Sequence, residues 1–170
     1  IDLYMDQVTT FIDNKLSHQK RDPDDKLLTK TMINNYTKSK ILLPSKNKKY
    51  NRQHMVLLIL IYYLKQILSI NDINLLFSPI LKGITSEKKP PDLLEELYNT
   101  FLDVKNDGFD VLEGILEEKQ QLIEAKIQNF PEDSKDMAKM LLTVLMLVTQ
   151  ANTQKRMAEK IIDEYFKIKK

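Results

Sequence analysis

The stretch "TKTMINNYTKSKILLPSKNKKYNR", residues 29–52, decides the fold of the first half of the chain, and it holds seven basic residues and no acidic one. Thr29 can cap a helix, because a threonine hydroxyl accepts a hydrogen bond from a free N–H group of the first turn. Apolar residues then follow at helical spacing: Met32, Ile33 and Tyr36. Pro44 prevents further helix, because proline has no N–H group. The sequence therefore predicts a helix that ends at about Lys40, followed by a basic loop.

The other face of this predicted helix is polar. Lys30, Asn34 and Lys38 lie four residues apart, with Thr31 and Asn35 alongside them. An asparagine amide can pair with two atoms of adenine, whereas lysine contacts to phosphate carry no sequence information. For the two asparagines, base contact and a polar helix face without a ligand are the alternatives.

Charge is unevenly distributed along the chain, whose formal net charge is only +2. Residues 26–71 carry nine basic residues and no acidic one, while the segments before and after have balances of −3 and −4. A block of this sign attracts a phosphate backbone or the acidic surface of a partner. A solvated basic face without a ligand is the remaining alternative.

Composition predicts a globular, all-α protein. The 170 residues are 42% apolar and 29% charged, with only three glycines and no cysteine. The lack of cysteine excludes disulfides and thiolate chemistry in this chain and is typical of a reducing cytoplasm, where we expect the protein. The longest apolar runs are well short of the roughly 20 residues that span a bilayer, so we expect no membrane attachment.

Three further helices are predicted in the first half: residues 3–16, Arg52 to about Leu68, and Ser69 through Phe77. Asn51 is placed to cap the second of these, and the Ser69 hydroxyl to cap the third. The helix that begins at Arg52 is apolar on most sides, which predicts that it forms the core of the first domain.

A linker is indicated by helix-breaking residues: Pro79, Gly83 and Pro90-Pro91. We therefore predict a first domain at residues 1–84 and a helical dimerisation or effector region at residues 85–170. In the second region an interruption is expected at Gly108, and a last helix at about residues 133–168. Its apolar residues alternate at spacings of three and four, which is typical of an antiparallel hairpin or a dimer interface. Between residues 137 and 148 apolar residues occupy more than one face of the helix, so a partner subunit or the first domain should cover the second apolar face.

Neither catalytic nor metal-binding constellations occur in the sequence. His18 and His54 are 36 residues apart with no cysteine near either, and there is no glycine-rich phosphate loop or HExxH motif. We therefore expect no enzyme activity, no metal and no cofactor.

Short segments of the first half occur in a recognisable order. Tyr36 is followed by "KILLP" at residues 40–44, then by the pair Lys49-Tyr50, and then by "LSINDI" at residues 68–73. This order resembles the DNA-binding domain of the mercury-resistance regulator (MerR) family, over residues 3–77. The combination "TKTMINNY…KKY…H…LLxxIYYLK" is also similar to a bacterial family catalogued only as a domain of unknown function.

The resemblance implies a winged helix-turn-helix whose second helix enters the major groove of DNA while the wing contacts the backbone. It implies these DNA-binding residues: Lys30, Thr31, Asn34, Asn35 and Lys38 on the helix, and Lys46, Lys48, Lys49, Tyr50 and Arg52 on the wing side. Tyr36 is expected in the core, while core packing and DNA contact are both open for Tyr50. We expect sequence-specific binding to double-stranded DNA by a transcription regulator.

We expect this regulator to be a homodimer through its C-terminal helices, because two recognition helices about 34 Å apart can read two half-sites. One alternative is a helical adaptor whose basic patch binds an acidic partner. Another is a sensor of an unknown small-molecule effector, with a pocket lined by methionines: Met137, Met140 and Met146. Plain core packing is the other interpretation of these methionines.

Overall fold

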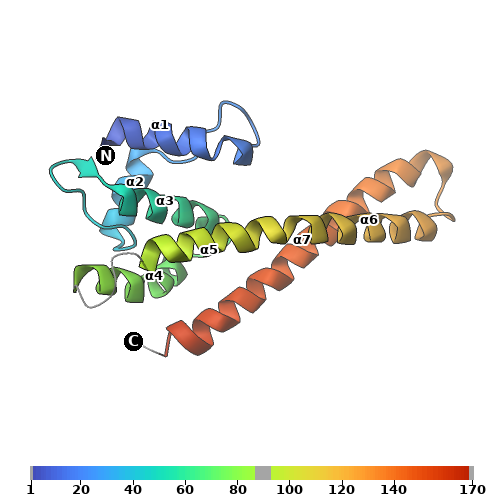
Figure 1. The fold of residues 1–170 in the computed structure, drawn as a ribbon. Coiled ribbons are helices and arrows are strands. Elements are labelled where there is room, and N and C mark those ends of the chain that lie inside the picture. Colours follow the sequence, from blue (N-terminus) through green and yellow to red (C-terminus); the bar gives the residue numbers. More distant parts are fainter. Residues whose placement is uncertain (1, 87–92, 169–170) are drawn as a thin grey trace. The chain divides into compact units, whose positions relative to one another are not determined.

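The computed structural model describes residues 2–86 and 93–168, and it is mostly helical, as the predicted all-α class requires (Figure 1). The helices of the described residues are α1 (Met5–Lys15), α2 (Lys30–Lys38), α3 (Arg52–Lys65), α4 (Ile70–Thr85), α5 (Leu93–Asp107), α6 (Phe109–Lys126) and α7 (Lys135–Ile161). Shorter elements are the strands β1 (Leu3–Tyr4) and β2 (Lys49–Tyr50), 3-10 turns at Ser17–Gln19 and Glu132–Ser134, and a π-helical turn at Ile162–Phe166. No helix in the described ranges combines the length and apolarity that crossing a membrane requires.

The chain divides into two compact units. Unit 1 comprises Ile1–Tyr98 together with Ile162–Lys170, and unit 2 comprises Asn99–Ile161. The predicted division into residues 1–84 and 85–170 stays a prediction. The Pro90-Pro91 pair of the predicted linker lies outside the described residues.

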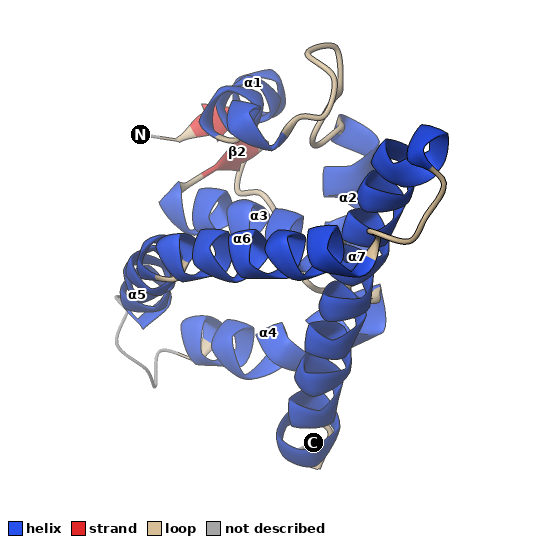
Figure 2. Cartoon of the chain, turned by 90° about the vertical axis from the view of Figure 1, so that its right-hand side faces the viewer, coloured by secondary structure: helices blue, strands red, loops and turns tan. Residues whose placement is uncertain are grey.

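Helix α3 forms the centre of unit 1, as its apolar sequence predicts. It contacts α1, α4 and β2, and Figure 2 shows it between α1 and α4. Most of its side chains are buried: His54, Met55, Val56, Leu57, Leu58, Ile59, Ile61 and Tyr62. The surrounding helices each bury a narrow apolar stripe against this core: Val8 and Ile12 of α1, Ile33 and Tyr36 of α2, and Ile73 and Phe77 of α4.

Side-chain caps start α2, α3 and α4 where the sequence predicts them. Thr29 accepts a hydrogen bond from the Met32 N–H group at 3.2 Å. Asn51 accepts one from His54 at 3.2 Å, and Ser69 accepts one from Asp72 at 3.1 Å. Each cap satisfies an N–H group that has no partner within its own helix, so the sequence alone locates these starts.

Helix α2 ends in a left-handed residue that is not glycine. The Ile41 N–H group donates to the Tyr36 carbonyl at 3.0 Å, and that of Lys40 donates to the Thr37 carbonyl at 3.1 Å. This pair of bonds is a Schellman motif, which places Lys40 at the position where glycine is common. Lys40 accordingly has a φ of 60°.

We expect Lys40→Gly to raise the free energy of unfolding of unit 1 by about 1 kcal/mol, because the left-handed conformation is unfavourable for a residue with a Cβ atom. The same change at Lys38, inside α2, should lower it by about 0.5–1 kcal/mol. Urea unfolding followed by tyrosine fluorescence measures both, since all seven tyrosines lie in unit 1. A change of the same sign in both variants would contradict the left-handed conformation of Lys40.

A tight turn follows at residues 46–49, which we call the lysine turn. Lys46 and Lys49 exchange both backbone hydrogen bonds, at 3.1 and 2.9 Å, while Asn47 and Lys48 have φ values of 52° and 62°. Positive φ at both central residues is typical of a type I′ hairpin turn. The turn leads into β2, which pairs antiparallel with β1, with Leu3 opposite Tyr50. Leu3 therefore belongs to a strand, and not to the helix predicted from residue 3.

Helix α4 is longer than predicted. It continues to Thr85 instead of ending at Phe77, so Pro79 and Gly83 lie inside the helix and not in a linker. A proline inside a helix costs about 3 kcal/mol. Apolar side chains beyond it pack against the core of unit 1, and their burial offsets that cost: Ile80, Leu81 and Ile84.

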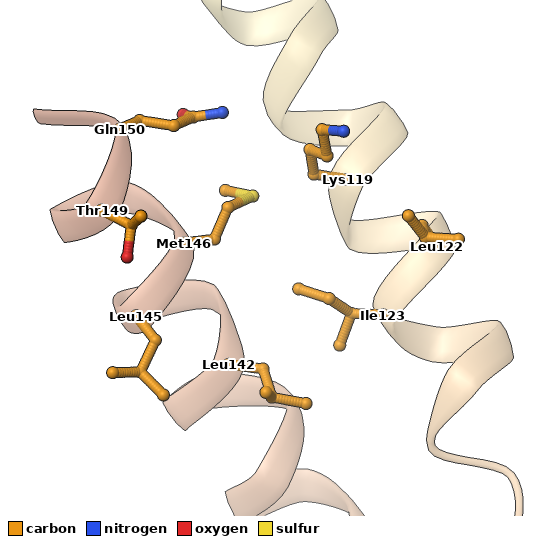
Figure 3. A pocket seen from close by; sticks show the side chains of 8 residues that line it. All are labelled: Lys119, Leu122, Ile123, Leu142, Leu145, Met146, Thr149 and Gln150. Carbon is orange, nitrogen blue, oxygen red and sulfur yellow. The ribbon is translucent and has the colours of Figure 1, made fainter. Parts of the chain in front are cut away.

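Unit 2 contains the hairpin of α6 and α7. Gly108 separates α6 from α5, as predicted. Lys139 of α7 pairs with Glu124 of α6 at 3.3 Å, and an apolar groove between the helices is lined by Ile123, Leu142 and Met146, among others (Figure 3). Met146 lines this groove, whereas Met137 and Met140 are exposed and do not line it; the sensor hypothesis stays a prediction.

Candidate nucleic-acid interface

The outer face of α2 carries the five side chains predicted for a recognition helix. All five are exposed: Lys30, Thr31, Asn34, Asn35 and Lys38. The opposite face is buried through Ile33 and Tyr36, so Tyr36 is a core residue, as expected. Burial also raises the pKa of the Tyr36 hydroxyl, which stays neutral. The outer face therefore combines amide, hydroxyl and ammonium groups and contains no carboxylate.

The lysine turn presents a second group of positive charges. Lys46 and Lys48 are exposed. Lys49 is half-buried, with its Nζ atom 5.3 Å from the centre of the Tyr4 ring, which is a cation–π distance. The ring contact fixes the base of the turn and leaves its tip to solvent.

Tyr50 belongs to the core of unit 1. Its side chain is 6% exposed, and its ring packs edge-on against His54 with the centroids 5.3 Å apart. Of the two interpretations left open by the sequence, core packing is the one that the structure shows. The buried Tyr50 side chain therefore anchors the end of the lysine turn to the core, and it is not part of the exposed surface.

His54 connects the start of α3 to the loop that leaves α2. His54 Nδ1 lies 3.1 Å from the Asn51 backbone nitrogen and 2.7 Å from Asn51 Oδ1, and His54 Nε2 lies 3.2 Å from the Pro44 carbonyl oxygen. Burial lowers the pKa of the imidazole, which outweighs the opposing effect of the Pro44 and Leu43 carbonyls. The neutral ring therefore holds together the segments that flank the lysine turn.

The positive charge of this surface is only partly compensated. Lys30 pairs with Asp6, and Arg52 pairs with Glu95 at 2.5 Å. On this surface, four exposed lysines make no ion pair with the described residues: Lys38, Lys40, Lys46 and Lys48. These four side chains can therefore bind an anion without first breaking a contact with a carboxylate.

Two residues of this surface were missed by the sequence analysis. Lys40 was predicted to end α2, and Asn47 was treated as part of an ordinary loop. Both have a positive φ and are exposed. For Asn47 a usable signal was the residue type, because asparagine adopts the left-handed conformation more often than other residues except glycine.

Comparison with known proteins places this surface within one family. No curated protein and no solved structure matches the chain. Residues 1–101 match the family model described as Domain of unknown function (DUF1836). This range includes α1 to α4, and therefore both the outer face of α2 and the lysine turn. Because the match covers more than half of the 170 residues, the chain belongs to the DUF1836 family.

Proposed function

We propose that unit 1 binds double-stranded DNA as a MerR-like winged helix-turn-helix and that the protein is a transcription regulator. In this proposal the outer face of α2 enters the major groove, and the lysine turn contacts the phosphate backbone. The supporting observation is the group of four exposed lysines that have no carboxylate partner in the described parts of the chain. A helix face that serves solubility alone usually mixes acidic and basic residues, and α2 contains no acidic residue.

The dimensions of this surface are compatible with duplex DNA. The nine residues of α2 give a helix of about 14 Å, and a helix fits the major groove, which is about 12 Å wide. Lys40 and Lys46 are six residues apart in the sequence, so their Cα atoms lie at most about 20 Å apart. The turn is therefore close enough to meet the backbone beside a groove that α2 occupies.

Two lysines of the surface occupy unfavourable backbone conformations. Lys40 and Lys48 have φ values of 60° and 62°, where a residue with a Cβ atom is about 1–2 kcal/mol less stable than in its usual conformations. Glycine would avoid this cost but would remove a positive charge. Lysine nevertheless occupies both positions in spite of the unfavourable conformation. This supports a functional role for the positive charge of these two side chains.

The residues have different roles in the proposed complex. Asn34 and Asn35 would read base edges, because an amide can pair with both N6 and N7 of adenine. Lys38, Lys40, Lys46 and Lys48 would contact phosphates and set the register of α2. Tyr50 and His54 would hold the lysine turn in place from the core.

Titration of a random duplex at several salt concentrations tests this proposal. Log affinity should fall linearly with log salt, with a slope of about −0.9 per neutralised phosphate. The double variant Lys38→Ala/Lys46→Ala should bind more weakly and reduce that slope by about two. The matched control is Lys15→Ala/Lys82→Ala, which removes two exposed lysines of α1 and α4 and should leave the slope unchanged.

Undetectable binding to duplex at low salt would contradict the proposal and favour the alternative of an adaptor that binds an acidic protein. Equal slopes for the two double variants would contradict the assignment of the surface. Circular dichroism spectra of the variants serve as the control for folding.

A further inference from the structure

The α6–α7 hairpin carries most of its apolar side chains on the outside. Within unit 2, Ile127 and Ala138 are the only buried apolar residues, whereas large apolar residues are exposed on every turn of α7 from Met137 to Val148. The contact between α6 and α7 is therefore narrow. A unit that buries so little apolar surface needs a further partner to be stable.

Five residues of α7 form a continuous stripe, which we call the seam: Met137, Leu141, Val144, Val148 and Ala151. They alternate at spacings of four and three, the pattern of a helix that packs against another helix. Val144, in the middle, is 55% exposed. Leu142 and Met146 point into the groove between α7 and α6 (Figure 3), and Val144 lies about 200° around the helix from Leu142. The seam therefore faces away from α6.

The exposed area is large enough for a stable interface. Monomeric proteins rarely expose an apolar patch of more than a few hundred Å². Covering the seam and the exposed apolar residues beside it, such as Met140 and Leu147, would bury on the order of 800 Å² per chain, the usual area per partner in a stable complex.

We propose that a second copy of this chain covers the seam, with the two α7 helices antiparallel around a two-fold axis between Val144 and Val148. Residues 140–154 contain no charged side chain, so the centre of such a pair is uncharged in both copies. An acidic or basic partner protein would find no complementary charge there. A closed two-fold dimer pairs the uncharged stretch with itself.

The ends of α7 favour the antiparallel arrangement. Lys155 continues the spacing of the seam and is its first charged residue. In an antiparallel pair Lys155 lies opposite Met137 of the second copy and beside Asp136 of that copy, whereas in a parallel pair two Lys155 side chains would face each other. Lys155 also pairs with Glu159 of its own helix at 3.6 Å, and only the antiparallel arrangement adds a second carboxylate beside it, that of Asp136.

This dimer does not depend on DNA binding by unit 1. If unit 1 does bind DNA, the dimer supplies two α2 helices to the same duplex, as a site with two half-sites requires. A result that contradicts DNA binding by unit 1 therefore leaves the proposed dimer unaffected, and the reverse also holds.

Sedimentation equilibrium of the full chain at micromolar concentration should give twice the mass of the 20.0 kDa chain. Val144→Glu should raise the dissociation constant at least about 100-fold, because each dimer would bury two carboxylates without partners. Gln154→Glu adds the same charge to an exposed position of α7 outside the seam and should have no effect. Glutamate is a better helix former than valine, so circular dichroism should show unchanged helix content in Val144→Glu.

A monomeric wild-type chain would overturn the proposal, because another part of the same chain or a small apolar molecule would then cover the seam. A dimer that withstands Val144→Glu as well as Gln154→Glu would also overturn it.

Disulfide formation tests the orientation, and the chain is suited to it because it has no cysteine. We expect an equimolar mixture of the Val144→Cys and Val148→Cys variants, after subunit exchange and mild oxidation, to form mainly the mixed disulfide between positions 144 and 148. Peptide mass spectrometry distinguishes this product from the two symmetric disulfides. Predominantly symmetric disulfides, which a parallel pair would form, would overturn the antiparallel arrangement.

Discussion

Replacing Leu57 with alanine is expected to lower the free energy of unfolding of unit 1 by about 2–5 kcal/mol. The Leu57 side chain is fully buried, at 0% exposure, in the helix that contacts α1, α4 and β2. The change removes apolar surface from the core and leaves a cavity that the surrounding helices close only in part. The expected loss is a large fraction of the 5–15 kcal/mol that is typical of a folded domain.

Urea unfolding monitored by tyrosine fluorescence measures this loss in unit 1 alone, because every tyrosine of the chain lies in that unit. The matched control is Ile67→Ala, two residues after the end of α3, where the side chain is 50% exposed. A surface change of this kind should alter stability by no more than about 0.5 kcal/mol. Similar losses in the two variants would contradict the central position of α3.

Unit 1 is expected to lose stability as the pH falls below about 6.5, the ordinary pKa of histidine, because His54 is buried in its neutral form. A histidine with a lowered pKa in the folded state takes up a proton in the unfolded state first. Its contribution to stability is therefore complete above the ordinary pKa and decreases as the pH falls through the lowered pKa. The Pro44 and Leu43 carbonyls favour the protonated ring, but desolvation of the charge outweighs their effect on the pKa.

The variant His54→Gln, which does not titrate, separates this effect from others. It should cost about 1–3 kcal/mol near pH 7, since it disturbs two hydrogen bonds of a buried group, and it should flatten the pH dependence below about pH 6.5, the ordinary pKa of histidine. Asp13 acts in a different range, because its hydrogen bond from Lys20 lowers its pKa from 3.8, and that contribution is lost only as the pH falls below 3.8. An unchanged slope in His54→Gln would contradict the role of His54.

Features that depend on neighbouring residues in the sequence were predictable. Thr29, Asn51 and Ser69 cap their helices because the side-chain oxygen of each reaches an N–H group only three residues ahead. Helix α2 has one buried and one exposed face because the helix repeats every 3.6 residues, which places Ile33 and Tyr36 on the side opposite the outer face. The interruption at Gly108 was predictable because glycine is unfavourable inside a helix.

Features that depend on distant contacts were not predictable. Leu3 lies in a strand because Tyr50 is opposite it, 47 residues along the chain. Helix α4 passes Pro79 because residues beyond the proline pack against a core built by other helices. Local preference alone would end the helix before that proline.

The sequence by itself determined the helical class, three helix starts, the segregation of positive charge into residues 26–71 and the polar outer face of α2, because all of these rest on the order of nearby side chains. Only the tertiary structure decided that Tyr50 and His54 are buried, that Lys38, Lys40, Lys46 and Lys48 have no carboxylate partner within the described residues, and that the seam of α7 faces away from α6. Burial, ion pairing and the direction of a helix face depend on which segments meet in space, and those meetings are set by the packing of the whole unit.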